Sequence, residues 1–306
     1  MPHVQIVHRT NYRYVRPVRF TPHRLMLRPR DSHDLRVRAA TLGLTPAAKS
    51  TRWAHDVFGN SVCLVEWNGI ESDQLDIVST LDLDHFPSGS RAPRETLDPI
   101  AETYPFSYAP EEFPDLARMM ERQHPDPARK VDAWVQRFLP RGKPARTMDV
   151  LAAITAAIKS DFTYAGREQE GTNAPRLTLE TRQGACRDFA LLMMEAVRAL
   201  GLAARFVSGY LYSDDASSTT VGGGATHAWV SIYLPGAGWV EYDPTNGLIA
   251  GRNLIRVSVA RAPEQAVPVV GGFVGGIRDF AGLTVDVTVT LKPDEAEPPP
   301  PPLVAA

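Results

Sequence analysis

The sequence predicts an α+β protein in which a small N-terminal β-sandwich or barrel precedes a core of helices packed on an antiparallel sheet. Three observations lead to this prediction. Polar and apolar residues alternate with period two through most of the first 88 residues, as they do in half-buried strands. Amphipathic helical patterns then dominate from residue 111 to residue 201. Short strand patterns follow from residue 203 onwards.

The composition narrows the class of protein before any motif is considered. The 306 residues are 43% hydrophobic and 22% charged, so the chain has enough apolar residues to bury a core. The formal net charge of −2 argues against a protein whose partner is a nucleic acid. The two cysteines, Cys63 and Cys186, are too few for a disulfide scaffold or a zinc site built from thiolates.

The sequence also gives an expectation about membranes and cellular location. The chain contains no run of about 18 apolar residues, so we expect no membrane span. The first residues lack the apolar segment of a secretory signal. We therefore expect a cytoplasmic protein, in a compartment where free thiols persist.

Residues 1–88 are expected to form the N-terminal β domain. Gly59-Asn60 lies between two apolar runs, and such pairs supply the positive φ of a tight hairpin turn. The histidines of this part are scattered without the spacing of metal ligands, which favours ordinary strand or surface histidines. The candidate strands cover residues 3–15, 23–30, 34–44, 52–67 and 74–86.

The rest of the chain divides into a linker, a core and a tail. Residues 89–110 are rich in Pro, Ser and Arg, which favours a linker. Residues 111–290 form the expected core, whose sheet should be completed by the strand pattern over 283–291. The segment 291–306, with consecutive prolines from Pro298 to Pro302, is expected to be an extended, disordered tail.

The elements expected in the core follow from changes in the hydrophobic period. Helical patterns cover residues 111–123, 127–139, 146–162 and 186–201, and a long loop is expected over residues 165–185. Gly201 is a natural end for the last of these helices. Strand patterns cover residues 203–212, 226–235, 238–244 and 253–260.

Cys186 lies at the predicted start of a helix, directly after Gln183-Gly184-Ala185. The unpaired N–H groups and the dipole at a helix N-terminus favour an anion, and a thiolate is the form of cysteine that attacks a carbonyl carbon. Gly184 permits a tight turn into the helix and leaves the approach to the sulfur open. The backbone N–H of Cys186 can stabilise the oxyanion that such an attack produces.

A thiolate nucleophile also needs a proton carrier and a group that orients it. His227 begins one predicted strand, Asp243 ends the next, and a short Pro-Gly-Ala-Gly turn joins the two strands. An antiparallel pair with this spacing can place the two side chains next to each other. Cys186, His227 and Asp243 therefore form a candidate set of nucleophile, base and orienting carboxylate. Taken singly, each of these residues is more often structural.

The segments GACRDFALLMMEAVRALGLAARFVSGYLY and THAWVSIYLPGAGWVEYDPTNG resemble the core of the transglutaminase-like superfamily, a papain-like fold. The segments HRLMLRPR and DVFGN resemble the β-region that precedes this core in bacterial members. The residues that carry the core resemblance are Cys186, Arg187-Asp188, Gly209-Tyr210, His227-Ala228-Trp229, Gly238-Trp239 and Asp243-Pro244-Thr245-Asn246.

The resemblance implies acyl transfer on a peptide bond or a glutamine amide of a protein or peptide substrate, with no metal and no organic cofactor. It implies Cys186 as nucleophile, His227 as general base and acid, and Asp243 as orienting residue. Tyr164 is a weaker candidate for an oxyanion or substrate contact, against a core tyrosine. Residues 259–269 depart from the family pattern, because the acidic-aromatic pair usual there is absent; this bears on the substrate wall.

Two alternatives stay open at this point. If the protein is an enzyme, we expect hydrolysis rather than cross-linking. Water is always available, whereas cross-linking needs a second site that admits an amine. The other hypothesis is a binding or assembly module that has the transglutaminase fold but does not catalyse a reaction. The presence of all three candidate residues argues against that module. The sequence leaves the substrate and the oligomeric state undecided.

Overall fold

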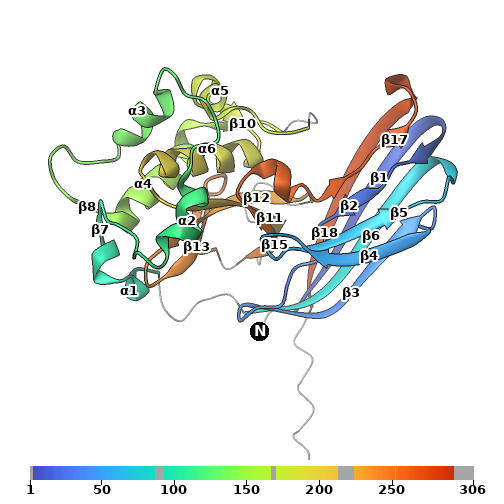
Figure 1. Cartoon of the computed structure of the whole chain (residues 1–306), viewed down its shortest axis with the longest axis horizontal. Helices are drawn as coiled ribbons and strands as arrows, with labels where there is room; N and C mark the ends of the chain where they lie inside the picture. The colour runs from blue at the N-terminus through green and yellow to red at the C-terminus, as the bar shows by residue number, and fades with distance from the viewer. Residues whose placement is uncertain (1–2, 87–92, 167–169, 213–223, 252, 293–306) are drawn as a thin grey trace, which may run out of the picture.

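A computed structural model describes residues 3–86, 93–166, 170–212, 224–251 and 253–292. The chain forms a β-sandwich and an α/β core that lie side by side (Figure 1). This arrangement confirms the predicted α+β class with an N-terminal β domain. The expected proline-rich tail beyond Lys292 lies outside the described residues.

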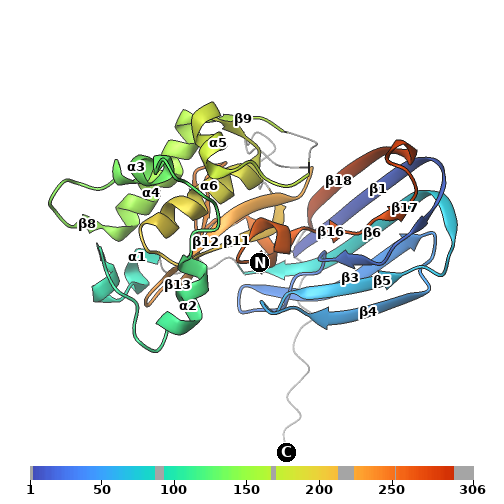
Figure 2. The same ribbon diagram turned by 45° about the horizontal axis from the view of Figure 1, so that its top comes forward.

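The sandwich has one sheet that contains all of its long strands and a second sheet made of short strands (Figure 2). Buried side chains from both sheets, among them Phe20, Leu25 and Ile77, form its interior. The first sheet has the order β17-β1-β6-β3, with β18 also paired to β1, and the second has the order β16-β2-β5-β4. The bounds are β1 His3–Phe20, β2 His23–Leu25, β3 Leu35–Thr45, β4 Ser50–His55, β5 Ser61–Glu66, β6 Glu71–His85, β16 Val269–Val270, β17 Phe273–Val274 and β18 Phe280–Lys292.

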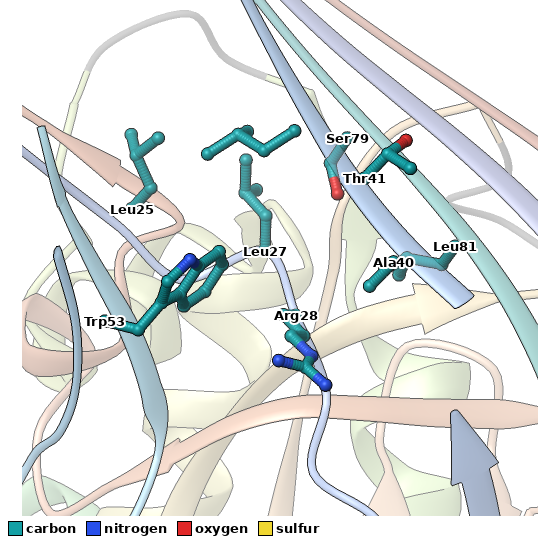
Figure 3. Close-up of a pocket in the computed structure, with 9 residues that line it drawn as sticks. Leu25, Leu27, Arg28, Ala40, Thr41, Trp53, Ser79 and Leu81 are labelled. Carbon is teal, nitrogen blue, oxygen red and sulfur yellow. The ribbon is translucent and has the colours of Figure 1, made fainter. Parts of the chain in front are cut away.

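A small hollow lies between the two sheets, with Trp53 and Arg28 near each other on one side and Leu81 across from them (Figure 3). The guanidinium carbon of Arg28 is 5.9 Å from the centre of the Trp53 ring. The hollow measures about 20 Å³, the space of roughly one water molecule. It is therefore a packing void of the sandwich and too small for a substrate.

The expectation that residues 283–291 complete the core sheet is wrong. Strand β18 pairs with β1 along almost its whole length, from His3 opposite Lys292 to Tyr14 opposite Phe280. The alternating pattern identifies a strand but not its partner, and β1 offers a free edge on the side that β6 leaves open. The C-terminal part of the described chain thus returns to the N-terminal sandwich.

The core is built around one central helix. Other helices pack on one side of it, and a sheet packs on the other. The sheet order is β14-β13-β12-β11-β15. Its strands are β11 Ala204–Leu211, β12 His227–Leu234, β13 Gly238–Asp243, β14 Leu248–Ile249 and β15 Leu254–Ala260. The helices are α1 Pro93–Thr96, α2 Phe113–Met120, α3 Lys130–Gln136, α4 Thr147–Asp161, α5 Pro175–Thr181 and α6 Cys186–Ala199, with short 3-10 turns η1 Pro99–Ala101, η2 Pro263–Ala266 and η3 Ile277–Asp279.

Helix α6 is the centre of the core because almost every one of its side chains is buried. Its residues join one cluster with those of α3 and α4 and with Val230, Ile232 and Leu234 of β12. A helix that is buried on all sides cannot shift without repacking its neighbours. Its N-terminal residue, Cys186, is therefore held in a fixed place.

The predicted linker is folded wherever the structure describes it. Residues 93–110 contain α1, η1 and the short strand β7 Thr103–Tyr104, which pairs with β8 Ala145–Arg146. Two tyrosines fasten this segment to the core: the Tyr104 hydroxyl donates to the Leu200 carbonyl at 3.0 Å, and the Tyr108 hydroxyl donates to the Tyr233 carbonyl at 3.1 Å. The composition suggested a linker, but it could not reveal this docking, which depends on contacts with distant residues. The expected loop 165–185 likewise contains α5.

The sandwich and the core share a buried apolar contact, and hydrogen bonds cross it. His8 lies 2.9 Å from the Tyr210 hydroxyl, and His85 lies 3.0 Å from the Tyr212 hydroxyl. The apolar cluster joins Val4, Ile6, Leu35, Leu81, Leu83 and Val287 of the sandwich to Tyr210, Tyr212, Ile255 and Val257 of the core. Across the described part of the chain, the helices are too short or too polar to cross a membrane.

The placement of β18 gives a test of the fold. Val287 is buried in the shared cluster, whereas the next residue, Thr288, is exposed. We expect Val287→Asp to cost about 3 kcal/mol or more of unfolding free energy, because it places a carboxylate in an apolar contact. Thr288→Asp should change stability by less than about 0.5 kcal/mol. Denaturant unfolding measures both, and equal effects would contradict this placement.

Candidate active site

The turn that leads into α6 is shaped around Cys186. Ala185 is extended, with φ −85° and ψ 173°, and Cys186 opens the helix. The buried carboxylate of Asp188 accepts the Ala185 N–H at 2.9 Å and the Asn173 N–H at 2.7 Å. This carboxylate caps the helix start, as a negative charge in a first helical turn should. It also ties the preceding loop to the same point.

Gly184 is required here by close packing. A Cβ at this position would lie 2.8 Å from the Cβ of Asp188 and 3.2 Å from the Phe189 ring. Gly184 also belongs to β10 Gln183–Gly184, which pairs in parallel with β9 Thr163–Tyr164. This pairing brings Tyr164 beside the start of α6. Burial raises the pKa of Tyr164, and the nearby side chain of Cys186 raises it further.

Strands β12 and β13 bring His227 and Asp243 together. The two strands are antiparallel, with Val230 opposite Tyr242. His227 Nε2 lies 2.8 Å from Asp243 Oδ2, and both side chains are fully buried. Asn246 also donates to Asp243 Oδ2, from its side-chain amide at 2.8 Å. The Thr245 N–H donates to Oδ1 at 2.9 Å, so the carboxylate is fixed from several sides.

Asn246 is a site residue to which the sequence argument assigned no role. It follows Asp243 by three residues in an Asp-Pro-Thr-Asn turn. An aspartate that accepts N–H groups two and three residues later is the pattern of an Asx turn, which is a readable signal for such a partner. The side chain of Asn246 orients the carboxylate that in turn orients His227.

The electrostatics of the pair favour a charged imidazole. Burial by itself would lower the pKa of His227, but the charge and hydrogen bond of Asp243, with a smaller contribution from Cys186, raise it to about 10. Burial opposes ionisation of Asp243 as well, yet His227 and Asn246 lower its pKa. The pair is therefore an imidazolium and a carboxylate at neutral pH.

Cys186 lies next to this pair. It lies close enough to the imidazole to contribute to the raised pKa of His227. Since Nε2 of His227 faces Asp243, the nitrogen left for the sulfur is Nδ1, which is buried and has no partner of normal hydrogen-bond geometry. Cys186 is 8% exposed, against 1% for His227 and 0% for Asp243, so Cys186 is the most accessible residue of the three. The structure thus brings the three predicted residues together.

The aromatic residues around the site fall into different classes. Trp229 is completely buried, and its ring stacks on His227 at 6.0 Å between centroids and 27° between planes. Trp239 lies farther along the sheet, under the Arg205 guanidinium at 4.1 Å. Tyr164 is 38% exposed and lies beside Cys186, so it borders the site from the solvent side. In the described ranges no three His, Cys, Asp or Glu side chains cluster in a way that could hold a metal ion.

Comparison with known proteins places this geometry in a family. Residues 4–84 match the bacterial transglutaminase-like N-terminal region, and residues 128–244 match the transglutaminase-like superfamily. An uncharacterized protein of Mycobacterium tuberculosis is 30% identical over 307 residues, covering 96% of this chain and 93% of that protein. The chain belongs to the transglutaminase-like superfamily.

Two further proteins are similar to this transglutaminase-like protein over most of its length. An uncharacterized protein of Mycobacterium leprae is 27% identical over 294 residues, covering 94% of this chain and 98% of that one. The crystal structure of a candidate cysteine protease from Cytophaga hutchinsonii superposes with a TM-score of 0.69, at 18% identity over 94% of this chain and 91% of that chain. At that identity the likeness shows a shared fold.

The pKa values of the buried pair predict a pH-dependent stability. Asp243→Asn should cost about 3–5 kcal/mol of unfolding free energy near neutral pH, because it leaves His227 buried without its counter-charge. The stabilisation from His227 is complete below its ordinary pKa of 6.5 and is lost as the pH rises through about 10. The stabilisation from Asp243 is present above its ordinary pKa of 3.8 and is lost as the pH falls through the lowered value.

Thermal unfolding of the wild-type protein and the Asp243→Asn variant measures this effect. The difference in Tm should be largest between pH 3.8 and 6.5 and should shrink as the pH approaches 10. A difference that stays constant over the alkaline range would contradict the assignment of an imidazolium to His227.

The Asp188 cap gives a second prediction. Asp188→Ala should cost about 2 kcal/mol of stability, since the Ala185 N–H at the start of α6 and the Asn173 N–H of the preceding loop lose their acceptor. Asp149→Ala is a matched control, because Asp149 also lies in the first turn of a helix but is exposed. The control should lose much less in a chemical denaturation experiment. Similar losses would show that Asp188 is an ordinary surface charge in its effect.

Proposed function

We propose that this protein is a cysteine-dependent acyl-transfer enzyme that acts on peptide bonds or glutamine amides of protein or peptide substrates. The observation that carries the proposal is the buried pair of His227 and Asp243 with Cys186 beside it at the start of α6. A helix start and an adjacent imidazolium both favour the thiolate form of a cysteine. A nucleophile, a base and an orienting group in these roles perform acyl transfer on several unrelated scaffolds.

The proposed reaction begins with attack of the Cys186 sulfur on the carbonyl carbon of the substrate. The electron pair of the C=O bond moves to oxygen, and the backbone N–H of Cys186 at the helix start is placed to stabilise that oxyanion. When the C–N bond breaks, His227 gives its proton to the leaving ammonia or amine. The products of this half-reaction are a thioester on Cys186 and a neutral His227.

A second acceptor then resolves the thioester. His227 takes a proton from water as the oxygen attacks, and the C–S bond breaks to release a carboxylic acid and restore the thiolate. Asp243 keeps the imidazole oriented through both halves and balances its charge. We propose water as the main acceptor, because an amine donor needs a binding site of its own. We keep the cytoplasm as the proposed location.

The alternative function is a binding or assembly module that retains the fold without turnover. The site favours the enzyme over the module for a physical reason. Burying an ionised His227–Asp243 pair costs desolvation energy that an apolar pair of similar volume would avoid. A module with no proton to transfer gains nothing from that cost.

Mass spectrometry of a glutamine-rich protein such as casein, incubated with the wild-type chain with and without a primary amine, tests the proposal. Deamidation (loss of ammonia with gain of water), amine incorporation and backbone cleavage each change the mass of the substrate by a different amount. We expect hydrolytic products that disappear in Cys186→Ala, because the nucleophile is gone, while circular dichroism shows an intact fold. Cys63→Ala is the matched control and should keep full activity. Products that persist in Cys186→Ala would remove Cys186 from the mechanism.

A further inference from the structure

The turn between β4 and β5, residues 56–60, leaves the sandwich and contacts the core. We call it the 56–60 turn. Asp56 holds its shape: Oδ1 accepts the N–H groups of Phe58 at 2.9 Å and Asn60 at 2.8 Å, and Oδ2 accepts the Asn60 amide at 2.8 Å. Gly59 supplies the positive φ, +75°, that closes the turn. The conformation of the turn is therefore stabilised by its own hydrogen bonds, independently of its contacts with the core.

Asn60 attaches the 56–60 turn to the edge of the core sheet. Its amide nitrogen donates to the Val259 carbonyl at 2.7 Å, and its amide oxygen accepts the Val259 N–H at 2.9 Å. Strand β15, which contains Val259, is the edge strand of that sheet in the order given above. The side-chain amide thus replaces the neighbouring strand that an edge residue lacks. Asn60 is buried, so water does not compete for these bonds.

Phe58 carries the contact toward the candidate active site. It packs against a cluster made of Val207, Leu211, Trp229, Leu254 and Val259, and also against the large cluster around α6. Within the first cluster, Trp229 stacks on His227. The position of the indole is tightly fixed, because a Cβ on Gly209 would lie 2.7 Å from its ring. Gly209 is itself the register partner of His227 in β11 and β12.

A continuous series of contacts thus runs from the sandwich to the imidazole. We propose that the 56–60 turn is a positioning element for His227, in which Phe58 supports the Trp229 ring that lies against the imidazole while Asn60 locks the sheet edge. This inference rests on the proposed function of the Cys186 site. It assigns the N-terminal domain a part in the chemistry, through Phe58, beyond adding buried area.

The alternative is that Phe58 only contributes packing energy between the two parts of the chain. A purely structural role would lower the stability of the protein and leave the reactivity of Cys186 unchanged. A positioning role would change that reactivity, because His227 sets the charge beside the sulfur, and small displacements of a catalytic group have large effects on rate. Reactivity and stability must therefore be measured separately.

The experiment measures the rate at which iodoacetamide alkylates Cys186 at neutral pH, with each cysteine followed by mass spectrometry of its peptide. Cys63 is an internal reference, because it is fully buried and burial raises the pKa of its thiol. The variants are the graded series Phe58→Leu, Phe58→Val and Phe58→Ala. In a parallel arm, 15N NMR of labelled histidine follows the titration of His227.

Two controls match the series. Val57→Ala alters the neighbouring residue of the same turn, whose side chain is 90% exposed. Phe20→Ala makes the same chemical change inside the sandwich, where Phe20 packs in a cluster that contains no residue of the core sheet. Phe20→Ala should lower Tm without changing the alkylation of Cys186. Val57→Ala should change neither quantity.

We expect the Cys186 rate to fall along the series, by about tenfold in Phe58→Ala, and to stay near the wild-type value in Phe58→Leu. The titration midpoint of His227 should move down from about 10 by about one pH unit or more in Phe58→Ala, since its contact with Asp243 loosens. If Phe58→Ala does not fold, the order of the Leu and Val variants carries the result.

The outcomes separate this inference from the proposed function. Selective wild-type alkylation with a flat Phe58 series and an unmoved His227 midpoint would overturn the positioning role and leave the proposed enzyme standing. Wild-type Cys186 reacting no faster than Cys63 would overturn the proposed function, while the His227 titration would still decide whether Phe58 positions the imidazole. A Phe20→Ala variant that slows Cys186 as much as Phe58→Ala would reduce the effect to general loss of stability.

Discussion

The buried contact between His227 and Asp243, at 2.8 Å, is the constraint on which the rest of the site depends. Two ionisable groups placed where water does not reach them must be paired and hydrogen-bonded, or they neutralise. The turn after β13 meets this demand by directing the Thr245 N–H and the Asn246 amide at the carboxylate. The imidazole then keeps one nitrogen committed to Asp243 and leaves the other for Cys186. The hydrogen bond between His227 and Asp243 therefore determines which nitrogen of the imidazole faces Cys186.

Helix α6 supplies the opposite half of the site by a different physical means. Its side chains are buried nearly all round, so its axis is fixed by close packing rather than by charge. Asp188 then fixes the exact start of the helix, and Gly184 permits the approach that this cap requires. Packing therefore determines the position of the Cys186 sulfur, and electrostatics determines the protonation of the His227 imidazole beside it. The two halves come from segments about forty residues apart in the chain, joined through the sheet.

The sandwich is more than a preceding domain, because the chain crosses back to it. Strand β18 closes on β1, and the shared cluster of Val4, Leu83, Tyr210 and Val287 makes one apolar interior of two parts. Contacts of this kind connect the 56–60 turn to the sheet that carries His227. A rearrangement in either part would displace residues of the other part, since close-packed interfaces transmit strain.

The sequence by itself determined the local features: the α+β class, the strands of the first 88 residues, the start of a helix at Cys186 and the strand positions of His227 and Asp243. These features are encoded in period, caps and turn residues, which act over a few neighbours. The tertiary structure alone decided that β18 joins the sandwich, that residues 93–110 dock on the core, and that Phe58 of the sandwich packs against the cluster that contains Trp229. Each of these depends on which distant surfaces meet. A pattern of alternating residues says that a strand has a buried face, but its partner is chosen by the free edges and apolar surfaces that the rest of the folded chain presents.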